Sequence, residues 1–252
     1  MIQVKSAKEI VKMMKAGELA AKALEFAGQN AVEGISTWEL DKMVNDFVVS
    51  HRGHSPCKGY GGFPGYNCYS VNEELIHGIP SKTKILKAGD ILSCDIVAEL
   101  DGYMGDNTKT FRIGGQVDEE KEKLLQATET ALYKGIEQAV KGSRIGDIGY
   151  AIQSCVEGAG YFVVKRFIGH GIGKEMHEDP EVPNYGRQGR GARLIPGMTI
   201  AIEPMVNQTT ENIRILEDGW TVLEGNNKMS AHFEHTVLIT EDKPVILTLT
   251  SH

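Results

Sequence analysis

The stretch that most constrains the fold runs from Gly89 to Arg112, with the sequence GDILSCDIVAELDGYMGDNTKTFR. Asp101-Gly102, between two runs rich in β-forming residues, is typical of a two-residue type I′ turn. The sequence therefore predicts a β-hairpin. Because side chains alternate faces along a strand, counting outward from the turn places Asp95, Val97 and Asp106 on one face.

The two aspartates of this hairpin would be diagonal neighbours, with Cα atoms roughly 7–8 Å apart. Asp95 also lies inside an apolar run, Ile91 to Val97. A buried carboxylate is costly unless it is paired, protonated or bound to a metal. A surface hairpin with two solvated aspartates is the alternative, but the apolar run favours a divalent cation between them.

Composition and charge exclude several classes of protein. The 252 residues are 41% hydrophobic and 24% charged, which is ordinary for a globular protein. No apolar run approaches the ~18 residues of a membrane span, and the charged N-terminal residues do not resemble a signal peptide. The net charge of −7 argues against DNA binding. Four cysteines without a CxxC pair indicate free thiols, so we expect a cytoplasmic protein without a membrane anchor.

Two capping boxes predict the first two helices. Ser6-Ala-Lys-Glu9 begins an amphipathic pattern that predicts a helix over about 7–30, and Ser36-Thr-Trp-Glu39 begins a second over about 37–50. A Gly/Pro/Tyr-rich loop follows, then short strands near 67–72 and 75–78. After Gly114, Asp118 is placed to cap a long helix that reaches about Val140.

The chain also carries a weak internal repeat at an offset of 108 residues. Ala139-Val-Lys-Gly142 matches Ala31-Val-Glu-Gly34, and at the same offset Asp95 matches Glu203. An offset held across a helix and a strand predicts two homologous α/β halves, about 1–115 and 116–252. No Pro-, Gly- or Ser-rich linker separates them, so we expect one fused domain over 1–252.

The repeat makes further predictions about the centre of the molecule. If the halves pack about a pseudo-twofold axis, equivalent strands would lie side by side, and Asp95 would face Glu203. The strand Ala231–Ile239 would place Glu234 in a position like that of Asp106. Trp220–Leu223 and this strand, joined through Glu224–Asn227, would form the hairpin that mirrors 91–112.

Five residues are the candidate metal ligands: Asp95, Asp106, His170, Glu203 and Glu234. Four carboxylates and one imidazole form an oxygen-rich set that favours Mn, Fe(II) or Co(II) over a structural zinc. Four converging negative charges suit two divalent cations. His170, in Gly169-His-Gly-Ile-Gly173, could by itself be an ordinary loop histidine. The segment lacks the GxGxxG spacing of a dinucleotide site.

At this point the sequence resembles a known family. The resemblance rests on Asn72-Glu-Glu-Leu-Ile-His77-Gly-Ile-Pro80, the Asp95/Asp106 pair, Gly169-His170-Gly171-Ile-Gly, His177-Glu-x-Pro180, Ile202-Glu203-Pro204 and Glu234-His235-Thr236. Together these segments, from about residue 3 to 242, resemble the type I methionine aminopeptidases. The resemblance implies the α+β pita-bread fold, in which two pseudo-symmetric halves surround a curved antiparallel sheet with the helices outside.

The resemblance also implies roles for individual residues. The five candidate ligands match the family's ligands for a dinuclear centre, and Glu203 would also shuttle a proton. His77 would hydrogen-bond to the scissile amide or assist proton transfer, and His177 would stabilise the oxyanion. Both could instead be ordinary pocket-wall histidines. The methionine pocket would be formed by Cys57, Tyr60, Phe63, Cys68, Met176 and Trp220. Met176 stands where phenylalanine is common in this family, and its flexible side chain makes that wall of the pocket more adaptable.

The implied function is removal of the initiator methionine from nascent polypeptides when the second residue is small, by a hydroxide that bridges two divalent metals. The alternatives are an Xaa-Pro aminopeptidase, which usually carries an additional N-terminal domain not seen here, and a non-catalytic binding protein on the same fold. We expect a monomer. The basic loop Arg187-Gln-Gly-Arg-Gly-Ala-Arg193 could be an ordinary solvated loop or could contact the ribosome.

Overall fold

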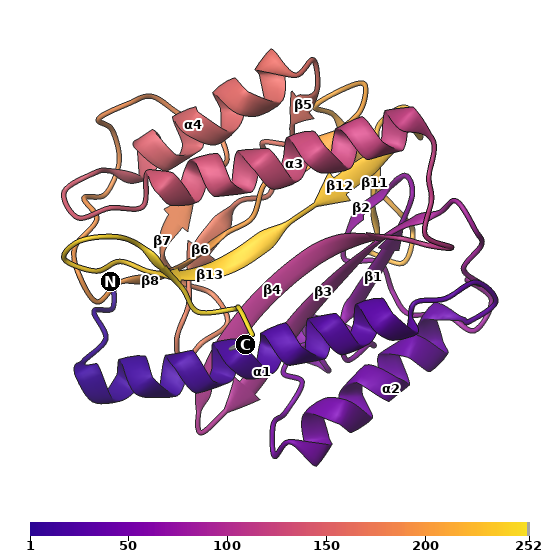
Figure 1. Ribbon diagram of the computed structural model, residues 1–252, viewed down its shortest axis with the longest axis horizontal. Coiled ribbons are helices and arrows are strands. Elements are labelled where there is room, and N and C mark those ends of the chain that lie inside the picture. Colours follow the sequence, from indigo (N-terminus) through magenta and orange to yellow (C-terminus); the bar gives the residue numbers. More distant parts are fainter. Residues whose placement is uncertain (251–252) are drawn as a thin grey trace.

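The computed structural model describes residues 1–250 (Figure 1). The four α-helices are α1 (Ala7–Asn30), α2 (Thr37–Ser50), α3 (Glu119–Glu137) and α4 (Ile145–Gly158), and a short 3₁₀ turn, η1, spans Tyr60–Gly62. The strands are β1 (Cys68–Val71), β2 (Glu74–Ile76), β3 (Ile91–Leu100), β4 (Tyr103–Arg112), β5 (Phe162–Val163), β6 (Gly169–Gly171), β7 (Glu178–Val182), β8 (Thr199–Ile202), β9 (Met205–Asn207), β10 (Ile213–Ile215), β11 (Val222–Glu224), β12 (Ser230–His232), β13 (Glu234–Leu238) and β14 (Val245–Ile246).

The two capping boxes form as predicted. The hydroxyl of Ser6 accepts the N–H of Glu9, whose carboxylate accepts the N–H of Ser6, and Ser36 and Glu39 repeat the arrangement at the start of α2. Asp118 caps α3 by accepting the N–H of Lys121. These local interactions satisfy N–H groups that a helix start leaves free, so each helix begins where the sequence predicts.

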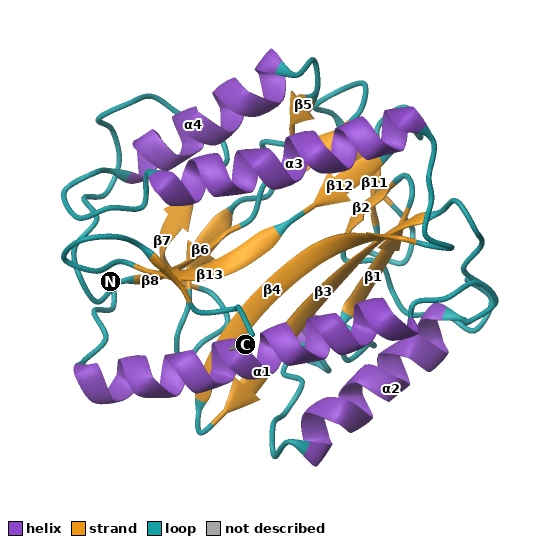
Figure 2. Ribbon diagram, viewed as in Figure 1, coloured by secondary structure: helices purple, strands orange, loops and turns teal. Residues whose placement is uncertain are grey.

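The main sheet has eight antiparallel strands in the order β1-β3-β4-β13-β8-β6-β7, with β14 also paired to β13. β13 joins the two halves of the sheet, because Glu234 pairs with Thr108 of β4 while His235 to Leu238 pair with β8. Figure 2 shows the strands curving between two pairs of helices. This arrangement confirms the predicted α+β pita-bread architecture.

The central hairpin has the predicted register. Asp95 pairs with Thr108 and Asp106 pairs with Val97, around a turn in which Asp101 and Gly102 both have positive φ. The even-numbered side chains of β3, Cys94, Ile96 and Ala98, pack into the core beneath α1 and α2. The odd-numbered Asp95 and Val97 therefore face away from the helices, into a cavity on the other face of the sheet.

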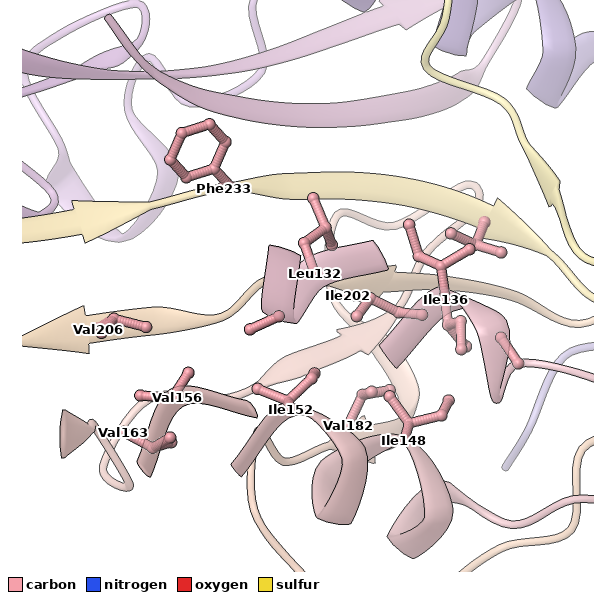
Figure 3. Packing of buried hydrophobic residues seen from close by; sticks show 14 of the residues in the cluster. Leu132, Ile136, Ile148, Ile152, Val156, Val163, Val182, Ile202, Val206 and Phe233 are labelled. Carbon is pink, nitrogen blue, oxygen red and sulfur yellow. The ribbon is translucent and has the colours of Figure 1, made fainter. Parts of the chain in front are cut away.

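The second half repeats the first at the predicted offset. α4 begins and ends 108 residues after α2, and the three pairs Leu40/Ile148, Val44/Ile152 and Val48/Val156 are all fully buried. Gly34 and Gly142 share a φ of 90°, and Gly89 and Gly197 have φ of 87° and 90°. Figure 3 shows the core of this half, where Ile148, Ile152 and Val156 of α4 lie close to Val163, Val182 and Ile202.

One prediction about the centre holds in part and another is wrong. The equivalent strands β4 and β13, which carry Asp106 and Glu234, do lie side by side. β3 and β8, the strands associated with Asp95 and Glu203, are not neighbours, because β4 and β13 lie between them. Trp220–Leu223 and Ala231–Ile239 do not form a hairpin either. β11 pairs with β10 and β2, while β12 pairs with β9. The reason is that both strands pair with partners more distant in the sequence, although the buried carboxylate of Glu224 does form a local turn by accepting the N–H groups of Asn226 and Lys228. The partner of β13 that mirrors the first hairpin is β8.

The remaining strands form two three-stranded sheets, β10-β11-β2 and β12-β9-β5, and Ile76 of β2 lines the cavity. Among residues 1–250, no helix is both long and apolar enough to cross a membrane.

Candidate active site

One cavity of about 190 Å³ opens on the face of the main sheet away from the helices. All thirteen candidate site residues line it: Cys57, Tyr60, Phe63, Cys68, His77, Asp95, Asp106, His170, Met176, His177, Glu203, Trp220 and Glu234. Ile76, Val97, Phe167 and Ile168, which the sequence analysis did not single out, complete the lining. The structure thus brings together residues separated by as much as 177 positions.

The most compact group in the cavity is formed by Asp106 of β4, His170 of β6 and Glu234 of β13. One ligand atom from each lies within 4.8 Å of the other two, and all three residues are buried. The Nδ1 atom of His170 lies 2.9 Å from the carbonyl oxygen of Gly171. If Nδ1–H donates to that carbonyl, the lone pair of Nε2 points at the carboxylates, which is the usual arrangement of a metal-binding histidine.

Asp95 and Glu203 complete the carboxylate set. Asp95 lies on β3, and Glu203 directly follows β8. The Oε1 atom of Glu203 lies 3.5 Å from Nε2 of His170, and the backbone carbonyl of Glu203 accepts a hydrogen bond from Asn184. Hydrogen bonds also position the central carboxylates: Thr108 donates to Glu234 at 2.7 Å, and the hydroxyl of Thr236 donates to the carbonyl of Asp106 at 2.9 Å.

Burial and mutual repulsion raise the pKa of these acids. Desolvation is the main cause for Asp95, Asp106, Glu203 and Glu234, and neighbouring carboxylates raise the pKa of Asp106, Glu203 and Glu234 further. One buried oxygen, Oδ1 of Asp106, has no hydrogen-bond partner. An unpaired buried carboxylate oxygen beside three more acids is unfavourable without a cation. The residues therefore fit divalent metal ions.

Burial lowers the pKa of the histidines around this cluster. The pKa of His170 falls to about 4 by desolvation and by the neighbouring His177, and that of His77 falls to about 4 by desolvation and by nearby histidines. Desolvation also lowers the pKa of His177. These rings are therefore neutral near pH 7, which suits both metal ligation and hydrogen bonding to a substrate.

His177 and His77 lie on different walls of the cavity. The ring centroid of His177 lies 4.3 Å from that of His170, and its Nδ1 lies 2.7 Å from the hydroxyl of Tyr60. His77, in a left-handed conformation with φ of 57°, has its ring 5.6 Å from Phe167 and 6.3 Å from Trp220.

An apolar pocket adjoins the carboxylates. Cys57, Phe63, Cys68, Val97 and Met176 are buried against one another, and Trp220 packs on them with its ring 5.2 Å from Phe63. The loop that supplies part of this wall is anchored to α2, because the carboxylate of Asp41 accepts the N–H groups of Tyr66 and Asn67. The pocket is thus both apolar and anchored to the helical layer.

The loop that carries Met176 and His177 is held by a buried ion pair. Glu178 contacts the ammonium group of Lys5 and accepts the N–H of Lys174 at 3.0 Å. The two side chains of the pair are only 5% and 9% exposed. The sequence offered no signal for this contact, because the partners are 173 residues apart.

His232 is the site residue that the sequence analysis missed. It ends β12, is 2% exposed, and has Nε2 3.5 Å from Oε2 of Glu203. Desolvation lowers its pKa to about 4. The only available signal was its position two residues before Glu234.

Comparison with known proteins identifies the family. The family model described as metallopeptidase family M24 matches residues 11–241. The chain belongs to this family. It is 48% identical to a methionine aminopeptidase of Clostridium acetobutylicum over 99% of both chains. The crystal structure of methionine aminopeptidase from Rickettsia prowazekii superposes with a TM-score of 0.96, at 40% identity, over 99% of this chain and 100% of that one.

The structural relatives also include proteins named for a different activity. The prolidase of Pyrococcus horikoshii matches with a TM-score of 0.76 and 25% identity, and this chain covers only 64% of it. The full-length similarity therefore places the chain with the methionine aminopeptidases, as predicted from its motifs. It is a metal-dependent hydrolase, and its buried carboxylate and imidazole cluster is the candidate site for a divalent metal.

Proposed function

We propose that this protein removes the initiator methionine from nascent polypeptides whose second residue is small. The observation that carries the proposal is the direct contact between two parts of one cavity, an apolar sulfur- and aromatic-lined pocket and a cluster of five candidate metal ligands. The full-length similarity to methionine aminopeptidases supports the same activity.

We propose that Asp95, Asp106, His170, Glu203 and Glu234 hold two divalent cations, with Mn, Fe(II) and Co(II) as the candidates. Oxygen donors with one imidazole favour these ions, and two cations would compensate four buried carboxylates. When bound, such cations activate water and polarise the scissile carbonyl group.

The side chains of the protein would then do the following. Glu203 accepts a proton from the attacking water and returns it to the leaving amine, a role supported by its place in the cavity beside the other candidate ligands. If the hydroxyl of Tyr60 donates to Nδ1 of His177, the neutral ring carries its proton on Nε2, which then donates a hydrogen bond to the substrate carbonyl oxygen. His77 hydrogen-bonds to the scissile amide or assists proton transfer.

The pocket residues would select the first residue of the substrate. Cys57, Phe63, Cys68, Met176 and Trp220 offer polarizable groups to an unbranched thioether, and the ring of Tyr60 lines the cavity beside His177. Met176 makes this wall more adaptable than an aromatic ring would.

The test is hydrolysis of Met-Ala-Ser, Met-Phe-Ser and Ala-Pro-Ala after EDTA treatment, with Mn, Fe(II) or Co(II) added back. We expect metal-dependent release of methionine from Met-Ala-Ser, little release from Met-Phe-Ser and none from Ala-Pro-Ala. The E203Q variant serves as the inactive control. Cleavage of Ala-Pro-Ala instead would mean an Xaa-Pro aminopeptidase. Metal binding without cleavage of any peptide would mean a binding protein.

We further propose that residues 1–252 form one catalytic domain built of pseudo-repeat halves, about 1–115 and 116–252. The sharing of β13 between β4 and β8 supports this organisation. The proposed setting is a cytoplasmic monomer acting at the ribosome. Arg187, Arg190 and Arg193 are exposed on one loop, and unchanged ribosome pelleting after replacement of all three would exclude that loop as the contact.

A further inference from the structure

The side chain of His232 is buried beside the candidate metal site, and the roles proposed above do not use it. Neither of its ring nitrogens has a hydrogen-bond partner among residues 1–250, although the residue is only 2% exposed. Buried polar atoms without partners are uncommon in folded proteins and call for an explanation. The nearest anionic atom is Oε2 of Glu203, 3.5 Å from Nε2.

The backbone of His232 is fixed from two sides. The hydroxyl of Thr110 lies 3.0 Å from its N–H and 2.8 Å from its carbonyl oxygen, and that hydroxyl is itself hydrogen-bonded to Ser93. On the other side, His232 pairs with Met205 of β9, two residues beyond Glu203. The ring therefore has little freedom to move away from the Glu203 carboxylate.

The carboxylate of Glu203 is held between two imidazoles. Oε1 faces Nε2 of His170, and Oε2 faces Nε2 of His232, both at 3.5 Å. A neutral imidazole carries one N–H, and for His232 only Nε2 has an anionic oxygen in reach. A distance of 3.5 Å is at the outer limit of a hydrogen bond, and such contacts in enzyme sites often tighten when ligands bind.

We infer that His232 is a positioning residue, whose Nε2–H donates to Oε2 of Glu203 and leaves Oε1 directed toward His170 and the metal. The inference deepens the proposed function, because it rests on Glu203 being a ligand. Residues that orient metal ligands in this way typically contribute 10–100-fold to metal affinity.

The experiment compares the H232L, H232Q and H235Q variants by calorimetric titration of the metal-free protein with Co(II). Leucine removes the donor, glutamine keeps one, and His235 is a matched control on β13 that bonds to Thr248 outside the cavity. We expect the first Co(II) to bind about 10–100-fold more weakly to H232L, and within about threefold of wild type to H232Q and H235Q. The visible spectrum of bound Co(II) should change in H232L only.

Circular dichroism and thermal melting show whether each variant folds, and H232M takes the place of H232L if the latter does not. Unchanged Co(II) affinity in the apolar variant would overturn the inference. Equal weakening in H232Q and H232L would also overturn it, because it would mean that packing, not hydrogen bonding, is responsible. Since the readout is metal binding, failure of the wild type to cleave Met-Ala-Ser would refute the proposed function and leave this test intact.

Discussion

The hydroxyl of Tyr60 provides a sharp test of how His177 is oriented. Tyr60 lies on the Gly-rich turn η1 and is 48% exposed, yet its hydroxyl is 2.7 Å from Nδ1 of His177. When the Tyr60 hydroxyl donates to Nδ1, the proton of the neutral ring is on Nε2, which is free to donate toward the substrate. Y60F removes this one interaction and keeps the aromatic ring that contacts His177, whose centroid is 5.3 Å away.

The size of the effect follows from the bond that is lost. A hydrogen bond between neutral groups contributes about 0.5–1.5 kcal/mol net. Because each 1.36 kcal/mol corresponds to tenfold in rate, Y60F should lower kcat/KM for Met-Ala-Ser by about 2- to 13-fold. The decrease should appear mainly in kcat, since the pocket wall is retained, and metal content should stay at the wild-type level.

The assay is steady-state release of methionine, with metal content measured on the same samples. The control is Y133F, which changes a similarly exposed tyrosine of α3 that does not line the cavity and should leave kcat/KM unchanged. Wild-type kcat/KM in Y60F would refute the positioning argument. A loss beyond about 100-fold, or loss of metal, would show that Tyr60 does something other than orient His177.

Three further predictions concern stability. G105A should lower the free energy of unfolding by about 1–3 kcal/mol in denaturant titrations, because a Cβ there would lie 2.6 Å from the α1 backbone, whereas G158A, with open space around it, should not. Burial lowers the pKa of His235 to about 4. Because the unfolded chain then binds a proton at higher pH than the folded protein does, the free energy of unfolding falls as the pH drops below about 6.5. Between pH 7 and pH 5 the free energy of unfolding of H235Q should therefore fall by about 2 kcal/mol less than that of the wild type. K5M should lower the free energy of unfolding by about 3–5 kcal/mol, because it leaves Glu178 buried without its partner. It should also raise KM, because this ion pair holds the loop of Met176 and His177. An unchanged melting temperature would contradict the stability prediction.

The parts of the fold that were predictable are those specified by local chemistry. The Asp101-Gly102 turn fixes the register of the hairpin, and a one-residue slip would turn Asp95 away from the cavity. Capping boxes fix the starts of α1 and α2 in the same local way. Asp95 was found because a carboxylate within an apolar strand is costly and therefore conspicuous, whereas Glu203 and Glu234 were found through the internal repeat and the family motifs.

The parts that were missed depend on contacts between distant segments. The pairing of β13 with β4 could not be deduced from neighbouring sequence, so an adjacent-strand hairpin was predicted in its place. The contact of Lys5 with Glu178 spans 173 positions and involves two residue types that usually lie at the surface. His232 was overlooked because a lone histidine in an apolar strand has no spacing pattern that marks it.

The position of β13 also sets the order in which the molecule can be assembled during synthesis. It is the last of the strands that carry candidate ligands, and it supplies both the contact between the two halves of the sheet and Glu234. While the ribosome is still translating the residues before 234, β4 and β8 each lack β13 on the edge with which it later pairs, and the ligand set is incomplete. Each new copy of this enzyme can therefore complete its candidate metal site only after nearly all of its own sequence has been made.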